Sequence, residues 1–251
     1  MAERERIEVI SSSYRFTHTL NLFLYTMLII TGLMLFSIDL TAWLAYSVGS
    51  PLATGIPTTE PIAQGVQWAR AWHRFLGHVW GALIIIYPLY LVITRRLTTF
   101  IPLKKGLRKQ IREAVAVSKY YLLGKPLPED IANNMDRHNI LVAHTAILLV
   151  VSSILLSVSG LAMVYRDAIG LDLEGFRLML LLHDVGFGMG VLYVLLHIFA
   201  VLDPMNRPLL LAMFGDGRVS LRWARNHMPK FVEKFLKKKE EEERIQEQLH
   251  M

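Results

Sequence analysis

Four long apolar runs dominate the chain. They cover residues 16–38, 72–94, 140–164 and 178–202, and the segments between them are richer in charged and turn-forming residues. Each run has the roughly 20 residues that an α-helix needs to cross a hydrocarbon core about 30 Å thick. The pattern predicts an all-α integral membrane protein with a four-helix transmembrane bundle. The first run is too long for a signal-peptide core, so we expect a retained span.

The polar segments divide the rest of the chain. We expect a four-span domain over residues 1–210 and a basic, charged tail over residues 211–251. Residues 104–123 (KKGLRKQIREAVAVSKYYLL) are typical of an amphipathic helix that lies along the membrane surface, and a solvated loop helix is an equal alternative. The Gly- and Pro-rich stretch at 49–61 predicts an irregular loop.

The positive charges predict how the chain is inserted. The segment between the second and third runs and the tail after the fourth are rich in Lys and Arg, whereas the loops at 39–70 and 165–177 are nearly free of them. Because cytoplasmic loops carry the excess of Lys and Arg, we expect both termini and the 104–123 helix in the cytoplasm. The location that follows is the cytoplasmic (inner) membrane of a prokaryote, crossed several times.

The composition limits the cofactors and partners that the chain can bind. The 251 residues are 53% hydrophobic, carry a formal net charge of +6 and include no cysteine. Disulfides, thiolate-bound iron–sulfur clusters and haem attached through cysteine are therefore excluded. The basic residues flank apolar runs, where they meet lipid headgroups, so we expect membrane lipid and no nucleic acid as a partner.

The fourth run, LLLHDVGFGMGVLYVLLHIFAVL (180–202), contains two histidines, which are costly in a membrane. His183 and His197 are fourteen residues apart, so on a helix they share one face at depths about 21 Å apart. Gly186 and Gly190 lie on the same stripe and would let a flat, bulky group approach the backbone. Helix packing is the simpler reading of these glycines.

Two other spans offer histidines at matching depths. His18 begins the first span on the side where His197 ends the fourth, and His73 begins the second span on the side of His183. The pairs His18/His197 and His73/His183 would provide the two axial ligands of an inner and an outer haem. The spacing thus predicts a bundle that holds two non-covalent b-type haems.

The remaining histidines near the spans have weaker signals. His78 is five residues from His73, which places it about 140° around the helix, so it is an alternative ligand only if the span rotates. His138 and His144 open the third span at the depth of the inner haem. They are candidates for proton transfer or a ligand pocket, or else interfacial polar residues.

Four stretches give the chain a family resemblance: YRFTHTLNLFLYTMLIITG around His18, ARAWHRFLG around His73, RLMLLLHDVGFGMGVLYVLLHIF around His183 and His197, and GDGRVSLRWARNHMPKF. Over roughly residues 12–235 the sequence resembles the dihaem cytochrome b (gamma) subunit of respiratory formate dehydrogenase of the formate dehydrogenase-N type. This group lies within the wider family of prokaryotic cytochrome b subunits of formate dehydrogenases and nickel–iron hydrogenases.

The resemblance implies a function for the bundle. It implies that the four histidines are the axial ligands in the pairing above, and that a menaquinone site lies beside the inner haem with Asn139 in it; His138 and His144 are further candidates. Electrons would pass from an iron–sulfur subunit, itself joined to a catalytic subunit that holds molybdenum, tungsten or nickel–iron, to the quinone on the cytoplasmic side. The chain itself would perform no other substrate chemistry.

Other readings remain open at this point. The chain is also compatible with the cytochrome b subunit of a membrane-bound nickel–iron hydrogenase or of a thiosulfate or polysulfide reductase. A small transporter with a histidine proton relay is a reading of another class, although no internal repeat is evident. A membrane anchor without cofactors would leave four aligned histidines unexplained.

Overall fold

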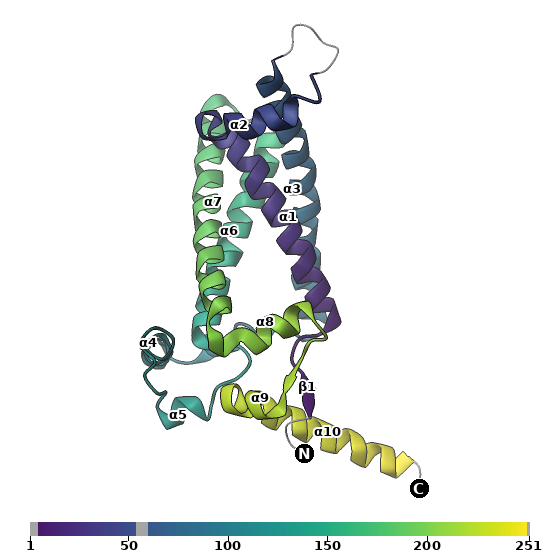
Figure 1. Ribbon diagram of the computed structural model, residues 1–251, viewed down its shortest axis with the longest axis vertical. Helices are drawn as coiled ribbons and strands as arrows, with labels where there is room; N and C mark the ends of the chain where they lie inside the picture. The colour runs from purple at the N-terminus through teal and green to yellow at the C-terminus, as the bar shows by residue number, and fades with distance from the viewer. Residues whose placement is uncertain (1–4, 54–59, 250–251) are drawn as a thin grey trace. The chain divides into compact units, whose positions relative to one another are not determined.

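The computed structural model describes residues 5–53 and 60–249, and its regular elements are nearly all helical (Figure 1). The helices are α1 (Ser12–Phe36), α2 (Ile38–Gly49), α3 (Pro61–Ile93), α4 (Leu107–Leu123), α5 (Glu129–Ala132), α6 (Ile140–Val164), α7 (Leu173–Leu202), α8 (Arg207–Phe214), α9 (Leu221–His227) and α10 (Pro229–Leu249), with 3-10 turns η1 (Ile101–Lys104) and η2 (Pro204–Asn206). Two short strands, β1 (Arg6–Glu8) and β2 (Arg218–Ser220), complete the described part.

The four predicted spans are confirmed. Helices α1, α3, α6 and α7 are each long and apolar enough to cross a membrane. Helix α3 starts at Pro61, well before the predicted residue 72, because its first turns (PIAQGVQWARA) are helical but too polar to register as part of an apolar run. Proline suits the first turn of a helix, where its missing N–H has no helical partner.

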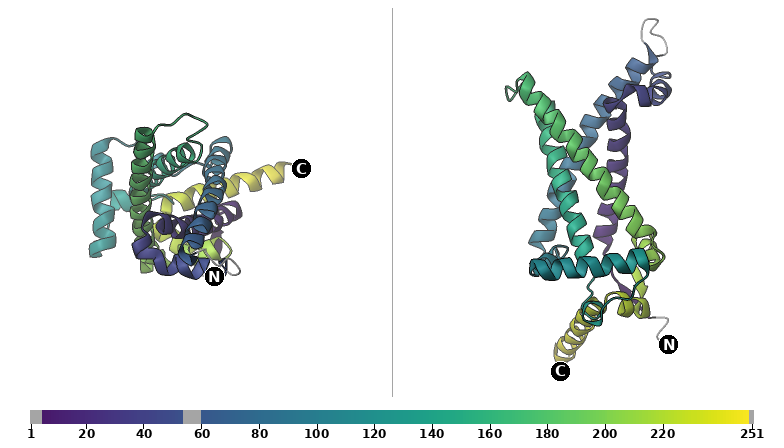
Figure 2. Two further views of the ribbon diagram at one scale, coloured as in Figure 1. Left: turned by 90° about the horizontal axis from the view of Figure 1, so that it is seen from above. Right: turned by 90° about the vertical axis from the view of Figure 1, so that its left-hand side faces the viewer.

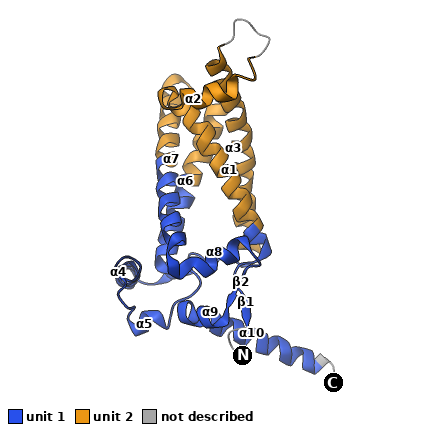
Figure 3. Cartoon of the chain, in the orientation of Figure 1, with its two compact units in different colours: residues 1–15, 95–152, 188–251 blue, residues 16–94, 153–187 orange. Residues whose placement is uncertain are grey.

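The chain forms two compact units (Figure 3). Unit 1 comprises residues 1–15, 95–152 and 188–251, and unit 2 comprises residues 16–94 and 153–187. These units differ from the division at residue 210 that the sequence predicts, because the N-terminal residues and the tail belong to the same unit. The boundary at 210 stays a prediction.

Apolar side chains from three helices form the centre of unit 2. Leu24 of α1 packs with Leu76 and Trp80 of α3, and Leu156 of α6 lies against this cluster. The indole N–H of Trp80 donates to the side-chain oxygen of Asn21 at 2.8 Å, so its polar atom is satisfied inside the apolar cluster.

Helix α2 was not expected from the apolar pattern. It occupies part of the 39–70 segment and packs on α3 at two glycines. A Cβ at Gly49 would overlap the carbonyl oxygen of Pro61, and a Cβ at Gly65 would overlap that of Ala45. Only glycine permits this backbone approach. The irregular loop predicted at 49–61 includes 54–59, which lie outside the described residues.

An antiparallel strand pair organises unit 1. Ile7 of β1 is paired with Val219 of β2, and both side chains belong to an apolar cluster that includes Leu221, Met228 and Val232. The turn before β2 depends on Gly217, which has a φ of 80° and whose carbonyl accepts the N–H groups of Val9 and Ile10. The segment that contains β1 therefore folds together with the tail.

The expected amphipathic helix is present as α4, seen along its length in the right-hand view of Figure 2. Its buried side contains Glu113 and Val117, and Lys105 binds both carboxylate oxygens of Glu113. An exposed stripe follows helical spacing through Leu107, Ile111 and Val115. This stripe is the kind of face that would contact lipid.

Candidate functional site

Two imidazoles, one from α3 and one from α7, lie close together in unit 2. The ring centres of His73 and His183 are 6.2 Å apart, and the ring planes are inclined at 72°. Two residues that are 110 positions apart in the sequence thus face each other inside a cluster of apolar helices. Such a placement for two polar side chains requires partners, because burying an unpaired imidazole is unfavourable.

A hydroxyl group partners each imidazole. Thr31 Oγ1 of α1 lies 3.0 Å from Nδ1 of His73, and Ser159 Oγ of α6 lies 2.9 Å from Nδ1 of His183. Both hydroxyl residues are almost completely buried, at 2% and 1% exposure. With Nδ1 engaged in each ring, Nε2 is the nitrogen that remains for a metal ion.

The separation of the rings fits two axial ligands on one metal. A bond from an imidazole nitrogen to a metal is about 2 Å long, and the ring centre lies about 1 Å beyond the nitrogen, so two rings on opposite sides of one metal have centres roughly 6 Å apart. The observed 6.2 Å agrees with this geometry. The residues therefore fit a group whose metal takes one imidazole from each side.

Glycines also border the two rings, but they are not the ones that the sequence suggested. A Cβ at Gly32 would lie 3.2 Å from Cε1 of His73, and one at Gly160 would lie 3.3 Å from Cε1 of His183. A Cβ at Gly186 would instead lie 2.9 Å from Cβ of Leu155, so this glycine packs α7 on α6. Gly190 is buried, and contact of either Gly186 or Gly190 with a haem stays a prediction.

The alternative ligand His78 has other partners. Its Nδ1 lies 2.7 Å from the carbonyl oxygen of Arg74, which can only accept, so Nδ1–H is the donor. Its Nε2 lies 3.0 Å from the hydroxyl of Tyr165 and accepts that hydrogen. Both ring nitrogens of His78 are therefore engaged outside the facing pair, which favours His73 as the ligand.

The second predicted pair is divided between the units. His18 is half-buried on the part of α1 in unit 2, and His197 is exposed on the part of α7 in unit 1. The ring of His197 stacks on Tyr193, with the centres 5.7 Å apart and the planes at 12°. The pairing of His18 with His197 stays a prediction.

The residues predicted for a quinone site lie at the start of α6 in unit 1. The side-chain oxygen of Asn139 accepts the N–H of Val142 at 3.0 Å, so it caps the helix. His138 is half-buried with Nδ1 3.3 Å from Thr98 Oγ1, and His144 is exposed. Asn139 thus has a structural role that does not depend on a ligand.

Burial, and to a smaller extent neighbouring charges, determines the protonation of His138. Burial, reinforced by the positive charge of Arg137, lowers the pKa of His138 to about 4, against the smaller opposing effect of Asp136. Burial by itself would raise the pKa of Asp136, but hydrogen bonds from Lys234 and from the backbone of Arg137 lower it overall. His138 is therefore neutral at pH 7, able to accept a proton but not to supply one.

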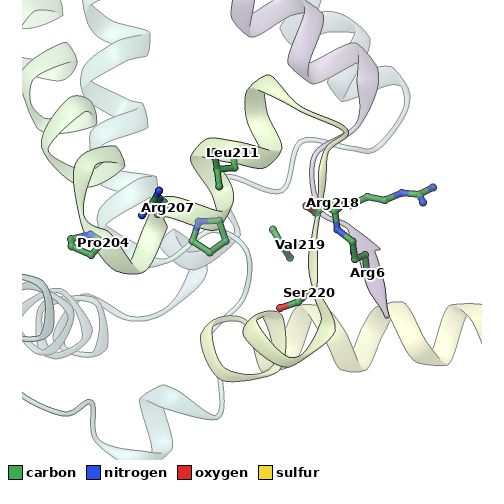
Figure 4. Close-up of a pocket in the computed structure, with 8 residues that line it drawn as sticks. Arg6, Pro204, Arg207, Leu211, Arg218, Val219 and Ser220 are labelled. Carbon is green, nitrogen blue, oxygen red and sulfur yellow. Dashed lines mark hydrogen bonds between the residues drawn. The ribbon is translucent and has the colours of Figure 1, made fainter. Parts of the chain in front are cut away.

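A separate pocket in unit 1 is lined by apolar and basic residues (Figure 4). Arg207 lies on one side and Arg6 and Arg218 on the other, with Val219 between them. The guanidinium of Arg6 is held by both carboxylate oxygens of Asp216. This pocket contains no residue of the predicted haem or quinone sites.

Comparison with known proteins assigns the class and then the family. The described residues form an all-α membrane protein with a half-buried pair of facing imidazoles, and a model of the family described as prokaryotic cytochrome b561 matches residues 9–216. The chain belongs to this family. It is therefore a membrane cytochrome b with a role in electron transfer, and b-type haem is its cofactor. No curated protein matches the chain.

Proposed function

We propose that the chain is the dihaem membrane subunit of a formate dehydrogenase-type complex and carries electrons from an outer iron–sulfur subunit to menaquinone at the cytoplasmic side. The observation that carries the cytochrome part is the pair His73 and His183, whose 6.2 Å separation and hydroxyl-bound Nδ1 atoms fit two axial ligands. When bound, haem supplies one-electron Fe(III)/Fe(II) chemistry.

The chain's residues determine what kind of chemistry is possible. Imidazoles on both sides of a metal leave no open position for oxygen or substrate, which restricts the site to electron transfer. His73 and His183 would hold the outer haem, and His18 and His197 would hold the inner one. For the second pair, the support is their placement on α1 and α7 and the shared face of His183 and His197.

The direction of insertion belongs to the same proposal. The basic segment with α4 and the charged tail with α10 would face the cytoplasm, because positive residues mark that side. The exposed apolar stripe of α4 would lie on the inner surface of the membrane. The quinone would then receive its electrons near Asn139, His138 and His144.

Relatives with the same bundle differ in the enzyme attached to it. A cytochrome b subunit of a nickel–iron hydrogenase or of a thiosulfate or polysulfide reductase would use the same histidines. The family match covers the spans and does not identify the attached enzyme. Identification of the iron–sulfur and catalytic subunits that co-purify with the chain would decide between these complexes.

The deciding experiment is the haem content of matched variants. We expect about two low-spin b haems per chain in the dithionite-reduced minus oxidised spectrum of the purified protein, and about one after His73→Ala or His183→Ala. His78→Ala is the matched control on the same helix and should retain both, because His78 is bonded to Arg74 and Tyr165. Full haem content in both His73→Ala and His183→Ala would overturn the assignment.

A further inference from the structure

Two hydroxyl–glycine dipeptides, Thr31-Gly32 on α1 and Ser159-Gly160 on α6, occupy equivalent positions around the facing imidazoles. In each, the hydroxyl lies against Nδ1 of one histidine and the next residue leaves room beside Cε1 of the same ring. We propose that Thr31 and Ser159 are positioning residues that hold His73 and His183 in the tautomer with hydrogen on Nδ1, ready to bind iron through Nε2. This inference rests on the proposed function of the histidine pair.

Accounting for the hydrogens assigns the tautomer. A hydroxyl group has one hydrogen to donate. Thr31 Oγ1 lies 2.7 Å from the carbonyl oxygen of Met27, one helical turn earlier, and a carbonyl can only accept. The 2.7 Å contact assigns the hydrogen of Thr31 to Met27, so the hydroxyl oxygen accepts from His73. His73 also bonds the backbone carbonyl of Leu28, which can only accept, and this independently places a hydrogen on the ring. Nδ1 of His73 carries a hydrogen, and Nε2 presents its lone pair.

The same accounting holds on the other side. Ser159 Oγ donates to the carbonyl of Leu155, again one turn earlier on its own helix, and accepts from Nδ1 of His183. Helix α3 thus supplies an imidazole and α1 its hydroxyl partner, and α7 supplies the other imidazole and α6 its hydroxyl partner. The arrangement is repeated within unit 2 although the two dipeptides are 128 residues apart in the sequence.

A hydroxyl is suited to this position in a membrane. A carboxylate would accept the imidazole N–H more strongly, but a charge is unfavourable among apolar helices. A Thr or Ser hydroxyl is neutral and already satisfied by its own helix, so it can be buried before and after the cofactor binds. It also leaves the imidazole a neutral ligand, whereas a carboxylate would push it towards imidazolate and lower the haem potential.

The glycines let the rings come close to the helix backbones. Because a Cβ at Gly32 or Gly160 would lie 3.2 or 3.3 Å from Cε1 of its histidine, the ring is in close contact with the helix backbone. Hydrogen bonding at Nδ1 and contact at Cε1 together determine the direction of Nε2. Partners that orient a ligand in this way typically contribute tenfold to a hundredfold to the affinity for a metal group.

The test compares Thr31→Val with Thr31→Ser and Ser159→Ala. Thr31→Val keeps the shape and removes the acceptor, so we expect at least about tenfold faster loss of one haem to apomyoglobin. We also expect a higher midpoint potential and a changed EPR signal for that haem. Thr31→Ser should restore all three, and Ser159→Ala should repeat the Thr31→Val pattern at His183. Thr41→Val is the control, because Thr41 donates to Ser37 in the same way and is bonded to no histidine among the described residues.

The outcomes separate this inference from the function on which it rests. If His73→Ala loses one haem but Thr31→Val and Ser159→Ala match the unaltered protein in haem loss, potential and EPR signal, the positioning role is wrong and the ligands stand. If His73→Ala and His183→Ala both keep two haems, the ligand assignment fails first. If Thr31→Ser fails to restore the Thr31→Val changes in a folded protein, the hydroxyl is not their cause.

Discussion

Unit 2 brings helix backbones together at glycines and gives its facing histidines hydroxyl partners, whereas unit 1 holds a larger apolar cluster and an ion pair with a buried carboxylate. In unit 2, Gly49 and Gly65 allow α2 to touch α3, and Thr31 and Ser159 bond the half-buried histidines. In unit 1, Lys105 pairs with Glu113. Between membrane spans, lipid adds no hydrophobic force, so helices associate by close packing and hydrogen bonds. In the segments of unit 1 outside the spans, the removal of apolar side chains from water stabilises the cluster.

Steric fit should therefore matter most in unit 2. Gly65→Val would place a branched side chain where a single Cβ already overlaps the carbonyl of Ala45. We expect a loss of about 3 kcal/mol or more, the upper range for overpacking. Thermal unfolding in detergent, followed by circular dichroism, would measure it.

Gly77→Ala is the matched control for that variant, since it lies on the same helix and a Cβ there would meet nothing within 4 Å. It should change stability by less than about 1 kcal/mol, in the stabilising direction, because alanine favours helix more than glycine does. Equal melting temperatures for Gly65→Val and Gly77→Ala would show that the close backbone contact at Gly65 matters no more to stability than the open position at Gly77.

A buried ion pair should have the next largest effect, in unit 1. Glu113 is 9% exposed in its side chain and Lys105 is 32% exposed. Glu113→Gln leaves the Lys105 ammonium without its partner, and we expect a loss of about 1–3 kcal/mol. Hydrogen exchange of the α4 amides would report it locally.

The comparison for this variant is Asp130→Asn, which breaks the pair between Asp130 of α5 and Arg112 of α4, the helix that also carries Glu113. Both of these side chains are more than half exposed. The effect should be under about 1 kcal/mol, as for other surface pairs. Neither variant should change the haem spectrum, because neither residue contacts the histidine pair; a spectral change in Asp130→Asn would contradict this expectation.

A helix cap should have a smaller effect. Ser220 Oγ accepts the N–H of Trp223 and caps α9. Ser220→Ala removes this acceptor and should cost about 1 kcal/mol, with faster hydrogen exchange at Trp223, while Ser220→Asn should keep most of the stability. Unchanged exchange in Ser220→Ala would mean that packing in the apolar cluster of unit 1 alone holds α9 in place.

The protonation of His138 should make the free energy of unfolding change gradually with pH. Since its folded pKa is about 4 against an ordinary value of 6.5, the unfolded chain binds more protons between these values. The stabilising contribution is complete above pH 6.5 and is lost as the pH falls towards 4. Titration of the His138 ring by NMR should show a midpoint below 5, and His138→Asn should flatten this part of the stability profile. A midpoint near 6.5 would contradict the burial of the ring.

The sequence predicted the features that depend on neighbouring residues. Span number and approximate bounds follow from apolar runs of sufficient length, and α4 follows from its local periodicity. The choice of His73 and His183 as partners came from counting depth along each span. The spans and α4 can be predicted because the rise and turn of a helix are the same in every protein. The ligand role of His73 and His183 stays a prediction. Helix α2 was not predicted, because its packing on α3 depends on the absence of side chains at two glycines, which a pattern of apolar runs does not reveal.

What the sequence determined by itself is an all-α membrane protein with four spans. The basic segments on one side and the histidines at matched depths stay predictions. The tertiary structure decided which groups meet: Thr31 with His73, Ser159 with His183, Tyr165 with His78, and the strand at Ile7 with that at Val219. A helix can be inferred from the residues within it, but a contact depends on how two helices rotate and approach each other. This rotation and approach depend on packing throughout the unit, so the role of a hydroxyl or a glycine is visible only together with the residue that it contacts.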